Sequence, residues 1–419
     1  MSSSPPAVPP RFAALRVPAY RRYFTFSLMS MMADNIEHVI SYWVMYQTFH
    51  SAALGGFAVI SHWVPFLLFS FWTGALADRH DCRRLIQIGQ AMYMCASLGW
   101  GLLFVFGHLQ MWHAVLLLTL HGLAGVIGAP AIQLIIHDTV PHEDLPSAIR
   151  LNASARYLSI LLGPAVGGGL MLLLGPARGI LTNVLIFVPF TILLLRFPYT
   201  GHATRGARVA AYGMDEARRV FNVVRGDSRI MTMVIIAGAT SFFVGNAFQA
   251  QMPAYANFLG ADETGTRYTM LLAADAVGAV IGVLLLETTH FSTTSVPVTI
   301  AAAGLWGVSM GLFPLTNSYT AALALLMLAG VFNIAFQSMS QTIVQLFAPP
   351  EIRGRVVGLF NVAMLGLRAG SGVTIGLFGV AIGVRLSLAL SSLAVVLVST
   401  ALLLRQTQRS APTVEVSHR

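Results

Sequence analysis

Two long apolar runs of the chain are joined by the charged stretch Gly74-Ala75-Leu76-Ala77-Asp78-Arg79-His80-Asp81-Cys82-Arg83-Arg84. The stretch places Gly, Asp and three Arg in a tight turn between segments that are otherwise almost free of charge. A short basic connection of this kind is typical of a loop between two membrane-spanning helices. The flanking chain is therefore interpreted as membrane helix.

The composition supports this interpretation. The chain has 419 residues, of which 56% are hydrophobic and only 10% charged, and its mean hydropathy is +0.72. An ordinary soluble domain is about 25% charged. A helix needs about 20 apolar residues to cross about 30 Å of hydrocarbon, and the chain has room for about twelve such runs. We predict an all-α, polytopic membrane protein.

The predicted spans form two sets of six around one long polar break at about 197–229. Their approximate bounds are residues 24–48, 54–77, 85–106, 112–136, 147–174, 179–196, 230–258, 267–287, 295–314, 319–346, 354–381 and 383–404. The predicted domains are an N-terminal tail at 1–22, a six-helix bundle at 23–196, a central loop at 197–229, a second six-helix bundle at 230–404 and a C-terminal tail at 405–419.

The loops predict the orientation and an internal repeat. Counted along the chain, 20 of the 25 arginines lie in the tails and loops of one side, which the positive-inside rule places in the cytoplasm together with both termini. Val140-Pro141-His142-Glu143 is echoed 208 residues later by Ala348-Pro349-Pro350-Glu351, which indicates two pseudo-symmetric halves. In the central loop, residues 215–224 can form a short amphipathic helix at the membrane surface or a solvated linker.

The opening stretch resembles the signature loop between helices 2 and 3 of the major facilitator superfamily, roughly G-x-L-A-D-R-x-G-R-R-R. Asp81 replaces the family's Gly, and Cys82 replaces a basic residue. The resemblance implies a cytoplasmic gate in which Asp78 faces the start of span 11 and basic loop residues pair with an acid at the end of helix 4. The predicted gate residues are Gly74, Asp78, Arg79, Arg83, Arg84 and Asp138. Either Arg83 replaces the missing cation or the inward-closed state is less firmly latched.

Three further stretches resemble the exporter branch of this superfamily. Residues 12–24 are similar to the amphipathic lead-in of macrolide-efflux and enterobactin-exporter relatives, the transmembrane secretion effectors. The helix 5 pattern G-P-x-x-G-G, typical of antiporters, is matched at Gly163, Pro164, Gly167 and Gly168, where a hinge or a packing face is reasonable. His121 occupies the Arg position of the helix 4 pattern R-x-x-Q-G, whose Arg is linked to proton transfer in the family.

Span 1 carries the densest set of ionisable residues. Asp34, Glu37 and His38 share one helix face by their spacing, and ionisable groups at bilayer depth are functional candidates. Such a set can bind a cation, carry a proton, pair with Arg or form a structural ion-pair network. His121 could exchange a proton or be an ordinary hydrogen-bonded side chain.

Other polar candidates are spread over both halves. Arg156 and Arg368 are 212 residues apart, close to the repeat offset, and could pair with the span 1 carboxylates or attract an anionic substrate group. The remaining candidates for a polar cavity are Asn246, Gln249, Asp275, Asn333 and Gln337. More of these side chains are expected to bond other helices than to face substrate.

These residues favour a secondary transporter that exports a small organic molecule by proton antiport through alternating access. One alternative is export of a divalent metal through Asp34, Glu37 and His38, completed by His62 and His121. Another is a transporter-like sensor or scaffold. Nucleotide-binding and hydrolase motifs are absent from the sequence, so an enzyme is not expected. We expect no cofactor, no nucleic acid, and a monomer in the bacterial inner membrane whose partners are its substrate, protons and lipid.

Overall fold

The computed structural model describes residues 12–202, 214–260, 264–288, 295–349 and 352–410. Within these ranges the chain is helical and contains no strand. The elements are η1 (Ala13–Arg16), α1 (Pro18–Phe49), α2 (Ala52–Arg79), α3 (Cys82–Phe106), α4 (Met111–Thr139), α5 (Leu145–Arg196), α6 (Met214–Gly226), α7 (Ser228–Phe243), α8 (Ala247–Ala250), α9 (Met252–Phe258), α10 (Thr266–Thr288), α11 (Val296–Leu312), η2 (Phe313–Leu315), α12 (Tyr319–Phe347), α13 (Arg353–Asn361), η3 (Val362–Gly366), α14 (Arg368–Ser371), η4 (Gly372–Leu377), α15 (Phe378–Ile382) and α16 (Val384–Ser410).

Ten helical segments of the described chain are long and apolar enough to cross a membrane by length and composition. α1 is not among them. α5 counts as one segment although Gly175, with φ 78° and ψ 162°, interrupts its helical backbone between the predicted spans 5 and 6. The protein is therefore an all-helical, multi-pass membrane protein.

Two predicted spans are less regular than expected. Span 7 is divided into α7, α8 and α9, because Gly245 has a φ of +42° and ends the regular helix. Span 11 contains two π-helical segments, η3 and η4, on either side of α14. π-helical turns are rare and are frequent at functional sites.

The chain divides into two compact units. Unit 1 comprises Met1–Phe49, Val64–Val209 and Glu263–Thr269. In this unit α1 and α3 both pack against α5, and α3 packs against α4. Its apolar core at one end of these helices includes Tyr20, Tyr23 and Phe190.

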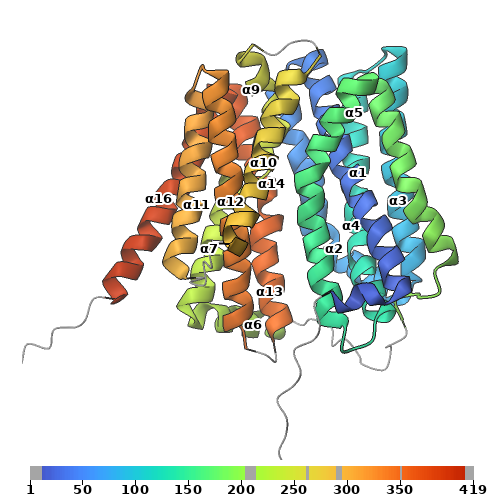
Figure 1. Cartoon of the computed structure of the whole chain (residues 1–419), viewed down its shortest axis with the longest axis vertical. Coiled ribbons are helices and arrows are strands. Elements are labelled where there is room, and N and C mark those ends of the chain that lie inside the picture. The colour runs from blue at the N-terminus through green and yellow to red at the C-terminus, as the bar shows by residue number, and fades with distance from the viewer. Residues whose placement is uncertain (1–11, 203–213, 261–263, 289–294, 350–351, 411–419) are drawn as a thin grey trace, which may run out of the picture. The chain divides into compact units, whose positions relative to one another are not determined.

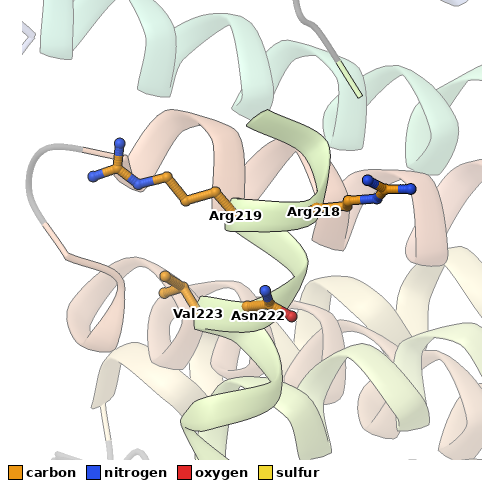
Figure 2. A pocket seen from close by; sticks show the side chains of 4 residues that line it. All are labelled: Arg218, Arg219, Asn222 and Val223. Atoms are coloured by element: carbon orange, nitrogen blue, oxygen red, sulfur yellow. The ribbon is translucent and has the colours of Figure 1, made fainter. Parts of the chain in front are cut away.

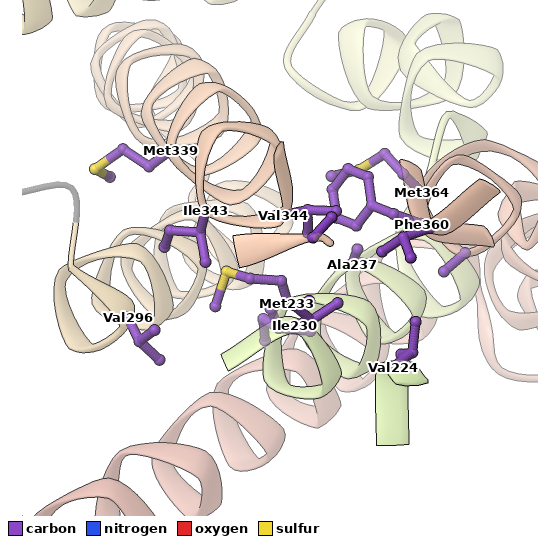
Figure 3. Close-up of a cluster of buried hydrophobic side chains, with 14 of the residues drawn as sticks. Val224, Ile230, Met233, Ala237, Val296, Met339, Ile343, Val344, Phe360 and Met364 are labelled. Atoms are coloured by element: carbon purple, nitrogen blue, oxygen red, sulfur yellow. The ribbon is translucent and has the colours of Figure 1, made fainter. Parts of the chain in front are cut away.

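Unit 2 comprises His50–Trp63, Ala210–Asp262 and Met270–Arg419. Figure 1 shows α11 alongside α12 and α16, and α7 also packs against α12 and α16. Figure 3 shows part of the core of this unit, where Ile230 and Met233 of α7 meet Ile343 and Val344 of α12. Each unit thus has an apolar core of its own.

Candidate functional site

A buried cluster of polar contacts in unit 1 lies between α1 and α4. The two ring nitrogens of His121 contact two different carboxylates of α1. His121 Nδ1 is 2.8 Å from Glu37 Oε1, and His121 Nε2 is 2.7 Å from Asp34 Oδ1. The side chains of His121 and Glu37 are 3% and 2% exposed, whereas that of Asp34 is 23% exposed. We call these three residues the α1–α4 triad.

Hydrogen-bond chemistry limits how the triad holds its protons. A carboxylate only accepts, so each contact between a nitrogen and an oxygen needs one proton between the two atoms. Either His121 is an imidazolium that donates to both carboxylates, or it is neutral and one carboxyl carries the proton. These two arrangements hold the same number of protons, so a proton can move within the triad without a change in its total charge.

A second layer of polar groups supports Glu37 from α3 and the later part of α5. Ser97 Oγ donates to Glu37 Oε2. Asn183 Nδ2 donates to Ala33 O at 2.9 Å and to Ser97 Oγ at 3.3 Å. Ser97 and Asn183 are both fully buried. Neither residue was predicted from the sequence, since an isolated Ser or Asn in an apolar helix carries no motif and only its polarity is a signal.

Aromatic rings enclose the imidazole of His121. The Tyr93 ring lies edge-on to it at 4.7 Å between centroids, and the His38 ring does so at 4.5 Å. Tyr93 in turn stacks on Phe187 at 5.5 Å. His38, predicted as part of the polar cluster, thus contacts His121 by its ring.

Glycines allow the helices to approach closely enough for these contacts. A Cβ on Gly163 of α5 would lie 2.4 Å from the Cβ of Asn35 on α1, and one on Gly167 would lie 3.1 Å from Ile36 Cα. A Cβ on Gly168 would collide with Thr269. The G-P-x-x-G-G segment is therefore a close-packing face of α5 beside the α1 carboxylates, with Pro164 buried within it.

The comparisons identify the family. The protein-family model described as transmembrane secretion effector matches residues 10–417. The chain belongs to this family of major facilitator superfamily transporters. It is a membrane transporter rather than an enzyme.

The chain is similar to named bacterial transporters. It is 24% identical to macrolide efflux protein A of Enterococcus faecalis over 71% of this chain and 92% of that protein. It is 24% identical to the staphyloferrin A transporter of Staphylococcus aureus over 35% of this chain, a match that spans only 37% of that relative. These are efflux-type and siderophore relatives.

Solved structures share the fold of the secretion effector. A bacterial homologue of the human lysosomal transporter Spinster, solved in an inward-facing, unoccupied conformation, aligns with a TM-score of 0.69 at 15% identity, over 98% of this chain and 100% of that one. The nucleoside transporter NupG aligns with a TM-score of 0.69 at 13% identity, over 92% and 98% of the two chains.

The metal-export alternative has no support. The relatives named above are macrolide and siderophore transporters by name. Both carboxylate oxygens of Glu37 are also engaged, one by His121 and one by Ser97. A cation held by Asp34, Glu37 and His38 would have to displace these bonds, so we abandon this alternative.

The candidates of unit 2 form separate local contacts. Gln337 Nε2 donates to Asn333 Oδ1 at 2.8 Å on α12. The Arg368 guanidinium, in a buried residue of α14, lies 5.2 Å from the centroid of the Trp63 ring. The other predicted residues, Asn246, Gln249 and Asp275, are half-buried, as is Arg156 of unit 1. Buried Gln251, which was not predicted, donates to Ala52 O at 2.7 Å.

The charged stretch at the start of α3 is organised by Asp81. Its carboxylate caps α3 by accepting from Arg83 N at 2.9 Å and pairs with the Arg83 side chain at 2.6 Å. The Arg83 guanidinium holds the pKa of Asp81 below its ordinary value, and Arg83 Nη1 also donates to Phe197 O at 2.5 Å. Arg83 thus connects its own turn to the end of α5.

The other residues of the predicted gate lie around this turn. Gly74 is half-buried in α2, while Asp78 and Arg79 are exposed at its end. Arg84 Nη1 donates to Gln87 Oε1 at 3.2 Å, and Asp138 is half-buried at the end of α4. The pairing of the loop with Asp138 stays a prediction.

Cys82 lies in this turn, where the family pattern has a basic residue. Its side chain is fully buried. A Cβ on Gly201 would lie 2.5 Å from Cys82 Sγ. Packing against the chain after α5 thus accounts for a small apolar side chain at this position, where a longer cation would not fit without displacement.

Proposed function

We propose that this secretion effector exports a small organic molecule in exchange for protons. The observation that carries the proposal is the α1–α4 triad, in which His121 bridges Asp34 and Glu37. Ionisable groups inside a membrane protein are costly and commonly serve ion or substrate pathways. Glu37 is sealed from solvent, and Asp34 is partly exposed, so Asp34 is the group through which the triad exchanges its proton with the aqueous path.

We also propose that the chain spans the membrane twelve times. The 52 residues of α5 would extend about 78 Å as one helix, far more than about 30 Å of hydrocarbon. The interruption at Gly175 lets α5 serve as two spans. α1 has 32 residues and is long enough to be a further span. Together with the arginine distribution, this supports cytoplasmic termini in the inner membrane.

Alternating access is the transport mode that this architecture favours. Two compact units, each with its own apolar core, supply the two bodies that the mechanism requires. Protonation of Asp34 would change the charge of the triad and so bias one conformation over the other. Substrate export and proton entry would then alternate as a monomer cycles.

The test is transport by proteoliposomes with an imposed pH gradient and a radiolabelled macrolide as the probe. The wild type should move the macrolide in the direction opposite to proton flow, and it should acidify the compartment that the macrolide leaves. Asp34→Asn and Glu37→Gln should each abolish the proton-driven component, while Ser241→Ala, a neutral change in unit 2 outside the predicted cavity, should retain it. Gradient-driven transport that persists in both carboxylate variants would contradict the proposal.

If the macrolide is not moved by the wild type, the same liposomes are loaded with iron-free carboxylate siderophores as the second probe. A wild-type chain that moves neither probe, and whose expression changes neither macrolide nor siderophore export by cells, would count against export of these classes. The two carboxylate variants report on coupling with whichever probe is transported.

A further inference from the structure

The helix α6 presents a basic surface at the edge of unit 2. Its residues Arg218, Arg219, Phe221, Asn222 and Arg225 are exposed. On its other side, Val220 and Val224 are 7% and 1% exposed and belong to the core of the unit. α6 is therefore a helix anchored by an apolar side, with a charged side left toward the surroundings.

Neighbouring elements add further arginines to this surface. α13 packs against α6 and begins with the exposed Arg353. Arg229, in the first turn of α7, is exposed, and its guanidinium lies 3.6 Å from the centroid of the Phe347 ring. The neighbouring acid Asp227 is paired with Arg229 at 2.7 Å. α6 also begins with Asp215 and Glu216, whose side chains lie outside the described set.

The surface lies beside the start of a candidate membrane span. α7 is one of the candidate membrane spans and begins at Ser228, two residues after α6 ends. The α6 arginines are thus within a few residues of the start of a span. Exposed apolar side chains occur on α6 and at the end of α12, namely Phe221, Leu346 and Phe347, and the Phe347 ring contacts Arg229. Arginine beside exposed aromatic and aliphatic side chains is the composition of a membrane-interface surface.

Figure 2 shows a pocket on this surface. The pocket has a volume of about 460 Å³ and is lined by Arg218, Arg219, Asn222 and Val223. The two guanidinium groups extend from opposite sides of the helix, and Asn222 and Val223 lie one turn further along. A guanidinium carries several N–H donors in a planar fork, so it can bind a phosphate while it keeps a protein partner.

We propose that this α6 surface binds the headgroup of an anionic phospholipid. The arginines supply the charge-assisted donors for the phosphate, Asn222 supplies an amide donor for a headgroup hydroxyl, and Phe221 contacts the acyl boundary. A zwitterionic headgroup places an ammonium beside its phosphate, and the excess of arginine disfavours that second charge. Each arginine near an anionic membrane surface adds to lipid binding, so two of them should shift it by about tenfold or more.

The test measures lipid binding to the full-length protein by native mass spectrometry in detergent. Phosphatidylglycerol and phosphatidylcholine with the same acyl chains are titrated in parallel. The wild type should bind phosphatidylglycerol about tenfold more tightly, and Arg218→Gln/Arg219→Gln should remove this preference. The matched control is Arg21→Gln/Arg22→Gln, which removes the same charge from an adjacent exposed pair on α1 and should retain it.

A second measurement tests the same lipid preference in a bilayer instead of in the mass spectrometer. Phe221→Trp is reconstituted into vesicles that contain brominated phosphatidylglycerol or brominated phosphatidylcholine. The quenching of tryptophan fluorescence in excess of that of the wild type is then compared between the two lipids. Stronger quenching by the anionic lipid supports the proposal. Equal binding and equal quenching by both lipids, or an equal loss in both double variants, would overturn it. Displacement of the lipid by equimolar glycerol phosphate would also overturn it, because the site would then select a soluble anion.

Discussion

The first membrane helices of the two units carry similar polar spacing with different chemistry. α1 has the carboxylates Asp34 and Glu37, whereas the segment from α7 to α8 has the amides Asn246 and Gln249 at the same spacing. The carboxylates of unit 1 meet a buried imidazole, and the amide pair Asn333 and Gln337 of unit 2 is neutral. The carboxylate–imidazole cluster therefore belongs to unit 1, and if the proposed proton coupling holds, it should depend on unit 1 more than on the amides of unit 2.

The largest effect is expected from His121→Ala. This change removes the partner of both α1 carboxylates and leaves the buried Glu37 charge uncompensated on one side. Removing one partner of a buried charge pair costs about 3 kcal/mol or more, and loss of an acid–base group costs transport about 100-fold. Proteoliposome transport and thermal unfolding in detergent measure the two effects.

The matched change in unit 2 is Gln337→Ala, which removes one neutral hydrogen bond and should cost about 1 kcal/mol. Transport should fall about fivefold or less, because 1 kcal/mol corresponds to about a fivefold change. If Gln337→Ala and His121→Ala reduce proton-driven transport equally, the proposed functional difference between the two units is wrong.

Helix packing gives the next contrast. A Cβ on Gly330 of α12 would lie 2.1 Å from Asp275 O, whereas a Cβ on Gly167 of α5 meets nothing closer than 3.1 Å. Gly330→Ala should therefore destabilise unit 2 by about 1–3 kcal/mol, and Gly167→Ala should cost less. Gly74→Ala is the control because no atom lies within 4 Å of its Cβ. Equal melting temperatures for all three variants would contradict the close helix approach at Gly330 and Gly167.

Two buried serines allow the effect of a hydrogen bond to a titratable group to be compared with that of a hydrogen bond to the backbone. Ser97 donates to Glu37, a titratable group, while Ser241 donates to the backbone oxygen of Met364. Ser97→Ala should reduce proton-driven transport about tenfold, which corresponds to one charge-assisted hydrogen bond of about 1.5 kcal/mol, and Ser97→Thr should restore it. Ser241→Ala should lower stability by about 1 kcal/mol and leave coupling unchanged. A coupling defect in Ser241→Ala alone would reverse the assignment.

The smallest effects are expected at two related helix caps. Asp81 caps α3 and pairs with Arg83, and Asp227 caps α7 and pairs with Arg229 at the same two-residue offset. Asp81→Ala and Asp227→Ala should each cost about 1 kcal/mol at neutral pH. The Arg83 side chain is 27% exposed and that of Arg229 is 48% exposed, so Arg83→Ala should cost more than Arg229→Ala.

The same caps predict a pH dependence of stability. The neighbouring guanidinium lowers the pKa of Asp81 and that of Asp227. A lowered carboxyl pKa gives stability that is present above the ordinary value of about 3.9 and lost as the pH falls below it. Unfolding of the wild type should therefore become easier below about pH 4, and the difference between wild type and the two Ala variants should shrink there. A constant difference down to low pH would disprove the linkage.

Several features could be predicted because they depend on local spacing. The spacing of Asp34 and Glu37 in an apolar run placed both on one helix face, and the structure brings both to His121. The predicted helix at 215–224 is part of α6. The helix interruptions at Gly245 and in η3 and η4 were not predicted, because an apolar run does not report where its backbone leaves the α-helical path.

The sequence by itself determined that the chain is a helical membrane protein of the major facilitator superfamily, since apolar length and the charged turn at Gly74–Arg84 are local properties. It could not determine which polar side chains meet. That Ser97 and Asn183 support Glu37, that Cys82 is buried against Gly201, and that Arg83 donates to Phe197 O were decided only by the tertiary structure. These contacts join residues far apart in the chain, and their positions follow from helix crossings that glycine and small side chains permit.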